Sequence, residues 1–276
     1  MFLLLEHLSL GLVACASERP TTRHPYLPVS HRHRLHQISQ YMSQPYFQFR
    51  RFTVRHDTSS MPVGTDGVLL GAWADVEGAS RILDIGTGSG LIALMAAQRA
   101  PNAQVEAIDV DEPSVRQAQQ NVQASPFARR IVVCQADVRT FSPEGGRFDH
   151  ILSNPPFFVN DVLPPDERRC TARNASALPA HSLMDAAARL LATDGRLSVV
   201  LPSSSQAMFV ALGLERALYL TRCLRVRTVA RKPPKRVLLE FARLRPSLTT
   251  CEEMVLQEAD GKRSPAYTSL TQDFYL

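Results

Sequence analysis

Short apolar runs alternate with amphipathic stretches through the middle of the chain. The apolar runs are residues 81–86 (RILDIG), 104–110 (QVEAIDV), 130–137 (RIVVCQAD), 148–154 (FDHILSN) and 196–202 (RLSVVLP). The stretches with helical spacing are residues 91–100, 113–124 and 181–192. Apolar runs of strand length that are separated by helices predict an α/β fold with a parallel, doubly wound sheet.

The last third of the chain has a different pattern. Residues 222–230 (RCLRVRTVA) and 236–244 (RVLLEFARL) are two further strand candidates, and only a basic segment containing Pro233 and Pro234 lies between them. Two strands with so short a connection pair antiparallel, because a parallel pair needs a long crossover. The sequence therefore predicts an antiparallel C-terminal hairpin on a mostly parallel sheet.

Residues 1–41 follow neither a strand period nor a helix period. They begin with an apolar stretch that lacks the positively charged start of a secretory signal, and a segment rich in His, Arg and Pro follows. The composition changes abruptly at Met42. We expect residues 1–41 to be a disordered extension or the product of a misassigned start, and residues 42–276 to form a single domain.

Composition narrows the class of protein. The chain has 276 residues, of which 45% are hydrophobic, so it can bury a large core. It has no apolar run long enough to cross a membrane within residues 42–276. The five cysteines are scattered without a CxxC pair, so we expect no metal site and a reducing, cytoplasmic compartment. The sequence gives no indication of the oligomeric state.

Basic residues gather in the predicted hairpin. The chain has 31 Lys and Arg against 26 Asp and Glu, and residues 222–245 hold nine of the basic residues with Glu240 as their sole acid. Phosphate contacts from such a patch give RNA affinity without sequence information, although a solvated face is the alternative. The candidate RNA contacts are Arg225, Arg227, Lys232, Lys235 and Arg236 in the hairpin, with Arg168, Arg169 and Arg173 in the segment after residues 154–157.

A glycine-rich loop follows the first predicted strand, at residues 81–86. The segment DIGTGSG spans residues 84–90 and includes Asp84, Gly86, Thr87, Gly88 and Gly90. Glycines at a turn from strand to helix let a ligand approach the main chain closely. Asp109 and Asp137 end the next two strands, where they can accept from ribose hydroxyls and from an adenine amine. Three strand-end acids beside the loop outline a nucleoside crevice, although each alone can equally cap a helix.

This arrangement resembles the class I S-adenosylmethionine-dependent methyltransferases. The resemblance implies a seven-stranded sheet whose last strands form an antiparallel hairpin, with S-adenosylmethionine as the cofactor. It also implies that Asp84 and residues 86–90 face the methionine end of the cofactor. Asp109 would then hold the ribose and Asp137 the adenine.

The tetrapeptide NPPF, residues 154–157, ends the fourth strand. A planar amine is a poor nucleophile because its lone pair is delocalised. Two acceptors on its N–H groups localise the lone pair, and the Asn154 side-chain oxygen and the Pro155 carbonyl are candidates. Proline restricts the preceding residue and fixes its own φ, so these acceptors are held in place by Pro155 and Pro156, while Phe157 can stack on a base. A proline-terminated edge strand is the alternative.

The flanking segments narrow the identity of the amine. Residues 51–73, 83–99, 124–131, 236–241 and 264–276 closely resemble segments of the bacterial tRNA(Val) adenine-N6 methyltransferases, which modify adenosine 37. The likeness covers residues 42–276 and implies tRNA as the partner. In GTDGVLLGAW, Thr65 or Asp66 is expected near a helix N-cap, and the resemblance adds a cofactor contact for Asp66.

Three other functions remain open. The same tetrapeptide occurs in protein glutamine N5-methyltransferases and in ribosomal RNA guanine-N2 methyltransferases. A non-catalytic RNA-binding module that keeps the fold is the third. Cofactor binding without methyl transfer to RNA would favour this last one.

Overall fold

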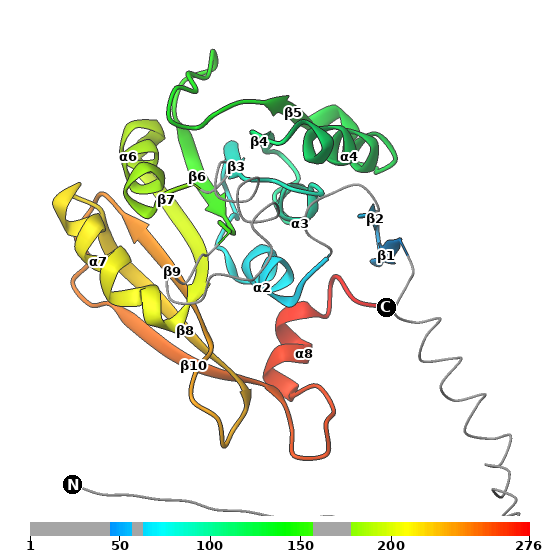
Figure 1. The fold of residues 1–276 in the computed structure, drawn as a ribbon, viewed down its shortest axis with the longest axis vertical. Coiled ribbons are helices and arrows are strands. Elements are labelled where there is room, and N and C mark those ends of the chain that lie inside the picture. Colours follow the sequence, from blue (N-terminus) through cyan, green and yellow to red (C-terminus); the bar gives the residue numbers. More distant parts are fainter. Residues whose placement is uncertain (1–44, 57–62, 157–177) are drawn as a thin grey trace, which may run out of the picture. The chain divides into compact units, whose positions relative to one another are not determined.

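The computed structural model describes residues 45–56, 63–156 and 178–276 of the chain. Within them, an eight-stranded sheet has the order β10-β8-β9-β7-β6-β3-β4-β5 (Figure 1). The strands are β3 (Arg81–Ile85), β4 (Gln104–Asp109), β5 (Ile131–Gln135), β6 (Phe148–Ser153), β7 (Leu191–Pro202), β8 (Tyr219–Val229), β9 (Arg236–Ala242) and β10 (Thr250–Gln257). Strand β9 runs antiparallel to β7 and β8, and the other pairings are parallel.

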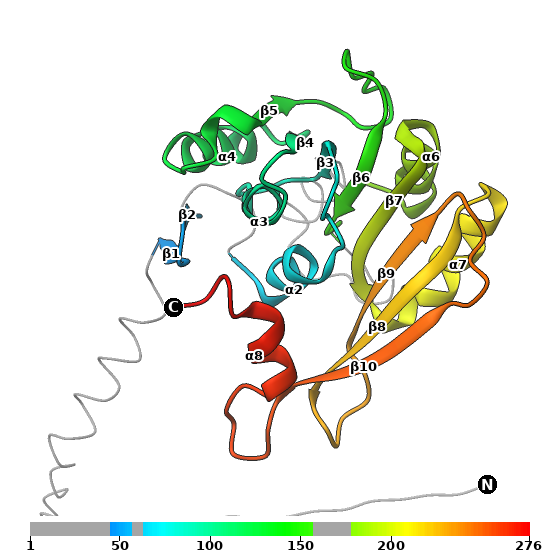
Figure 2. The same cartoon turned by 180° about the vertical axis from the view of Figure 1, so that it is seen from behind.

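Helices cover both faces of the sheet, as Figure 2 shows from behind. The helices are α2 (Thr65–Trp73), α3 (Leu91–Arg99), α4 (Glu112–Gln123), α6 (Ala180–Leu190), α7 (Gln206–Glu215) and α8 (Pro265–Thr271). Short 3-10 turns, η1 (Ala128–Arg130) and η2 (Ser203–Ser205), connect them to strands. One hydrophobic cluster includes residues of α2, α3 and α8, and a second includes residues of α6 and α7. The predicted doubly wound α/β fold is therefore confirmed, although the main sheet has eight strands among the described residues instead of the expected seven.

The predicted strands are all present, and the structure adds others. Strand β10 pairs in parallel with β8 and so lies outside the predicted hairpin. A separate antiparallel pair, β1 (Tyr46–Gln48) and β2 (Thr53–Arg55), precedes the main sheet in sequence. Aromatic stacking joins this pair to the C-terminal residues, since the Phe49 and Tyr275 rings lie 6.0 Å apart and 19° from parallel.

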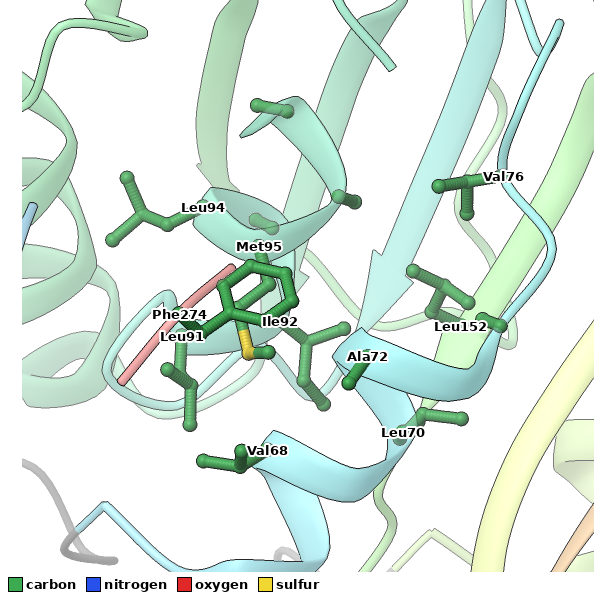
Figure 3. Packing of buried hydrophobic residues seen from close by; sticks show 14 of the residues in the cluster. Val68, Leu70, Ala72, Val76, Leu91, Ile92, Leu94, Met95, Leu152 and Phe274 are labelled. Carbon is green, nitrogen blue, oxygen red and sulfur yellow. The ribbon is translucent and has the colours of Figure 1, made fainter. Parts of the chain in front are cut away.

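Helices α2 and α3 pack closely beside the carboxyl ends of the strands (Figure 3). A Cβ atom on Gly71 would lie 2.6 Å from the Met95 sulfur, so this contact requires glycine. Val68, Leu70 and Ile92 are buried in the same cluster. This dense packing fixes α3, whose N-terminus carries the glycine-rich loop.

Two helix starts test the sequence predictions. Helix α4 has Asp111 as its N-cap, which accepts a hydrogen bond from Ser114 N, and Pro113 lies in its first turn as expected. Helix α2 has Gly64 as its N-cap, without a side-chain hydrogen bond. Thr65 and Asp66 therefore lie next to the N-cap as expected, in the first turn of α2, although neither side chain caps the helix.

The remaining predictions concern residues 1–41, membrane-spanning segments and metal sites. The expectations for residues 1–41 lie outside the described residues, and residues 45–276 belong to one compact unit of the chain. In the part of the chain that the structure describes, no helix is long and apolar enough to cross a membrane. The same residues contain no cluster of three or more His, Cys, Asp or Glu side chains arranged to hold a metal ion.

Candidate active site

The strand register places the predicted site residues at one edge of the sheet. Ile85 of β3 pairs with Ser153 of β6 on one side and with Ile108 of β4 on the other. Gly86, Asn154 and Asp109 directly follow these three residues in the chain. The Ser153 hydroxyl donates to the Ile85 carbonyl at 2.9 Å and ties the ends of β6 and β3 together. The glycine loop, one strand-end acid and the NPP segment are therefore neighbours.

The glycine loop is held by backbone hydrogen bonds and by helix packing. The N–H groups of Gly86 and Thr87 both donate to the Ile108 carbonyl, at 2.9 and 3.0 Å. Gly86 and Gly88 have φ values of +70° and +56°, which favour glycine. A Cβ on Gly90 would lie 3.3 Å from the Ala118 Cβ of α4. The loop is therefore shaped before any ligand binds.

Asp84 is the most buried acid of the site, with no exposed surface. Its Oδ2 accepts from the Thr87 hydroxyl at 2.7 Å and from Ala93 N at 3.1 Å. Its buried Oδ1 has no hydrogen-bond partner among the described residues. Burial raises the pKa of Asp84 to about 7. An unsatisfied carboxylate oxygen beside a helix N-terminus fits the cationic amino group of the methionine end of S-adenosylmethionine.

Asp109 braces the loop from the neighbouring strand. Its Oδ2 accepts from Gly88 N at 2.9 Å, and its Oδ1 accepts from Asp111 N at 3.0 Å. Desolvation raises the pKa of this carboxyl, and the two backbone donors oppose that effect. Each oxygen keeps a further lone pair, so ribose binding by Asp109 stays a prediction that is consistent with these contacts.

Asp137 differs from the other two acids because it already has a charged partner. It lies two residues beyond β5, and both of its carboxylate oxygens accept from Arg139 Nε at 2.9 Å. The side-chain hydrogen bond from Arg139 lowers the pKa of Asp137. The adenine contact of Asp137 stays a prediction, and it requires Arg139 to share this carboxylate or to move.

The NPP segment follows directly from β6. Asn154 is half-buried, Pro155 is buried and Pro156 is exposed. The Asn154 amide has no hydrogen bond to another described residue. Within the described part of the chain, no other group therefore occupies the Asn154 amide oxygen. Phe157, Arg168, Arg169 and Arg173 lie outside the described residues, so their predicted roles stay predictions.

The tip of the β8–β9 hairpin lies at the same edge of the sheet. Arg236 pairs with Pro202 at the end of β7, and β7 lies next to β6, which leads to Asn154. Two strand spacings correspond to about 10 Å. Arg231, Lys232 and Lys235 are exposed at this tip. Exposed basic groups therefore lie at the same carboxyl-terminal edge of the sheet as the NPP segment.

Two predicted RNA contacts have carboxylate partners instead. Arg236 Nε donates to Asp66 Oδ2 at 2.6 Å, which links the hairpin to the first turn of α2. Arg227 forms an ion pair with Glu253 of β10 at 3.0 Å. Arg225 is half-buried, and no ion pair joins it to another described residue.

Sequence reasoning missed two residues that shape the site. Ser153 joins the ends of β6 and β3, and its place immediately before the tetrapeptide was the available signal. Asn121 of α4 donates to the Ser89 carbonyl in the glycine loop at 2.8 Å. No local pattern marks a single Asn in an amphipathic helix.

Comparison with known proteins agrees with this geometry. Residues 64–225 match the family model described as the methyltransferase small domain. A protein of Parabacteroides distasonis named tRNA1(Val) (adenine(37)-N6)-methyltransferase is 42% identical over 236 residues, which cover 85% of this chain and 99% of that protein. A Bacteroides fragilis protein of the same name is 44% identical over 239 residues, with 85% and 99% covered.

A solved structure shows the same fold. A predicted O-methyltransferase from Agrobacterium tumefaciens has a TM-score of 0.59 and 19% sequence identity, and the match covers 76% of this chain and 96% of that one. Together with the loop and the strand-end acids, these likenesses define the enzyme class. The chain belongs to the tRNA1(Val) (adenine(37)-N6)-methyltransferase family and is an S-adenosylmethionine-dependent methyltransferase.

Proposed function

We propose that this enzyme methylates N6 of adenosine 37 in tRNA(Val). The observation that carries the proposal is that Asn154 directly follows Ser153, which pairs with Ile85 at the start of the cofactor loop. The hydrogen-bond acceptor for the substrate amine and the loop proposed to bind the methyl donor therefore follow adjacent strands. The names of the relatives, which state this base and this tRNA, support the choice of substrate.

Asn154 and Pro155 orient the amine in this proposal. The Asn154 side-chain oxygen accepts from one N–H and the Pro155 carbonyl from the other, which localises the nitrogen lone pair. Burial of Pro155 and the Ser153 hydrogen bond hold both acceptors in place. S-adenosylmethionine, when bound, supplies an electrophilic methyl group on a sulfonium sulfur. Phe157 stacks on the extruded base.

The amine nitrogen becomes positively charged as it forms the new C–N bond and the C–S bond breaks. Acceptors aimed at the N–H groups stabilise this developing charge. The nitrogen then loses one proton to solvent, and the product is N6-methyladenosine. Because an ammonium of this kind is strongly acidic, no histidine base is needed.

The cofactor side of the proposal assigns a role to each acid. Asp84 Oδ1 accepts from the amino group of the methionine end, Asp109 accepts from the ribose hydroxyls and Asp137 accepts from the adenine amine. The loop residues Gly86, Thr87, Gly88 and Gly90 give the main chain access to the cofactor. Asp66 contributes to cofactor binding indirectly, through its ion pair with Arg236.

The basic hairpin supplies the RNA contacts. Arg225, Lys232 and Lys235 bind phosphates near the anticodon, because their charges have no carboxylate partner among the described residues. Arg227 and Arg236 contribute less, since each is already paired. Arg168, Arg169 and Arg173 are further candidates from the sequence.

The test uses purified enzyme, S-adenosylmethionine with a labelled methyl group and a tRNA(Val) transcript. Label is expected in N6-methyladenosine, and a transcript with guanosine at position 37 should accept none. Parallel reactions replace the transcript with a glutamine-containing peptide or with ribosomal RNA, and label in the peptide or in guanosine N2 instead would favour one of the same-fold alternatives. Cofactor binding without any transfer would indicate a non-catalytic module.

A further inference from the structure

Asn121 joins three separate parts of the chain through one buried side chain. It is 2% exposed and lies on the inner face of α4. Its Nδ2 donates to the Ser89 carbonyl and to the Arg55 carbonyl, both at 2.8 Å. Its Oδ1 accepts from Arg55 N at 2.9 Å. Both donors of the amide and one acceptor are therefore used.

The contact with Arg55 replaces a missing strand neighbour. Arg55 ends β2, which pairs on its other edge with β1. A single amide that binds both the N–H and the C=O of one residue copies the pairing that an adjacent strand would give. The unit formed by β1 and β2 is thereby fixed to α4.

The contact with Ser89 acts on the cofactor loop. Ser89 lies between Gly88 and Gly90, which both have positive φ, and glycine has little intrinsic stiffness because it lacks a Cβ atom. Gly88 N must point at Asp109, and Gly90 N at the Thr87 carbonyl. A fixed Ser89 carbonyl sets the plane of the peptide between Ser89 and Gly90 and so restricts this loop.

We infer that Asn121 is a positioning residue for S-adenosylmethionine, because it holds the glycine loop in its binding conformation and couples that loop to the β1–β2 unit. Asn121 does not touch the cofactor in this account. Its loss releases the Ser89 peptide and unpairs the backbone N–H and C=O groups of Arg55 at the end of β2. The inference concerns cofactor binding and stands whichever amine is methylated.

The test compares Asn121→Ala with wild-type enzyme by calorimetric titration of S-adenosylmethionine without RNA. The dissociation constant is expected to rise about tenfold, as for one buried hydrogen-bond network lost. The KM for the cofactor should rise similarly, while kcat at saturating cofactor changes less than about threefold. Asn121→Gln keeps the amide but displaces it by one methylene. This variant should also raise the KM for the cofactor with little change in kcat, and its melting temperature should fall less than that of Asn121→Ala.

Thr271→Ala is the matched control for stability. Thr271 is 1% exposed and donates to the Tyr267 carbonyl in α8, so its loss also removes a buried hydrogen bond. This variant should melt earlier and yet bind the cofactor as wild type does. Unchanged cofactor affinity in both Asn121 variants would overturn the inference. An equal loss of affinity in Thr271→Ala would overturn it as well, since general destabilisation would then explain the effect.

Discussion

The cofactor side and the RNA side of this active site are built on different physical principles. On β3 and β4, Asp84 and Asp109 accept hydrogen bonds from the protein's own loop, and most of their surface is buried. At the β8–β9 tip, Lys232 and Lys235 extend into solvent without an acidic partner among the described residues. The first arrangement is preorganised for one small molecule, and the second gives affinity for many phosphates.

The two sides meet at Asn154 and at one ion pair. Asn154 directly follows Ser153, which pairs with Ile85 before the cofactor loop, while the Asp66–Arg236 pair joins α2 to the start of β9. A substitution on either side should therefore disturb one ligand and spare the other. Only the meeting points should affect the methyl transfer itself or both ligands.

The largest effect is expected for Asn154→Ala. Removal of one preorganised acceptor should lower kcat by about 100-fold or more. Binding of S-adenosylmethionine should stay within about twofold, because the glycine loop and its acids are unchanged. Single-turnover kinetics measure the first quantity and calorimetry the second. If cofactor binding is lost instead, Asn154 supports the fold of the cofactor side rather than the amine.

Charge reversal of the hairpin should give the next largest effect. The double variant Lys232→Glu and Lys235→Glu should weaken tRNA binding by about tenfold and reduce its salt dependence. Cofactor affinity should not change. Arg116→Glu, which reverses an exposed charge on α4, is the control and should bind tRNA normally. Equal losses of tRNA affinity in the two variants would indicate that the hairpin acts only through the overall charge of the protein surface.

Protonation of Asp84 should change the stability of the protein and its affinity for the cofactor in opposite directions. Because burial raises the pKa of Asp84 to about 7, the native state holds a proton that the unfolded chain releases near pH 4. The contribution of Asp84 to stability is therefore present below pH 4 and is lost as the pH rises to about 7. That loss is about 4 kcal/mol as an order of magnitude.

Cofactor affinity should follow the opposite trend. A charged amino group prefers the ionised carboxylate, so affinity should increase as the pH rises through about 7. Melting curves without cofactor and binding titrations across this range measure the two trends, with Asp84→Asn as the reference that lacks the titrating group. If wild type and Asp84→Asn have parallel pH profiles, Asp84 does not bind the cofactor as proposed.

The smallest effect is expected at the ion pair between the two sides. Asp66 and Arg236 are partly exposed, so the pair contributes roughly 1 kcal/mol or less. Arg236→Gln and Asp66→Asn should each raise the KM for S-adenosylmethionine a few-fold and change tRNA affinity less. If Arg236→Gln weakens tRNA binding as much as Lys232→Gln does, Arg236 is a phosphate contact instead.

The cofactor side was the easier one to predict from sequence. Segments such as 81–86 and 104–110 are mostly apolar and carry Asp84 and Asp109 near their carboxyl ends, so local pattern and chemistry agree. Strand β10 was missed because its residues Glu252 and Glu253 are exposed and its apolar stretch is short. An edge strand is half solvated, and its sequence resembles a loop.

The long-range contacts could not be predicted in the same way. Arg236 and Asp66 lie 170 residues apart, and nothing local to RKPPKR indicates that one of its charges is neutralised. Asn121 reaches Arg55 across 66 residues for the same reason. The sequence therefore indicated which groups carry the chemistry, whereas the structure shows which of them are already bonded.

The most direct test of the account is nucleoside mass spectrometry of tRNA(Val) from cells that lack this gene. Wild-type protein supplied to these cells should restore N6-methyladenosine at position 37, and Asn154→Ala should not, despite normal cofactor binding. Restoration by Asn154→Ala at the wild-type level, or no methylation at position 37 with wild-type protein, would contradict the account.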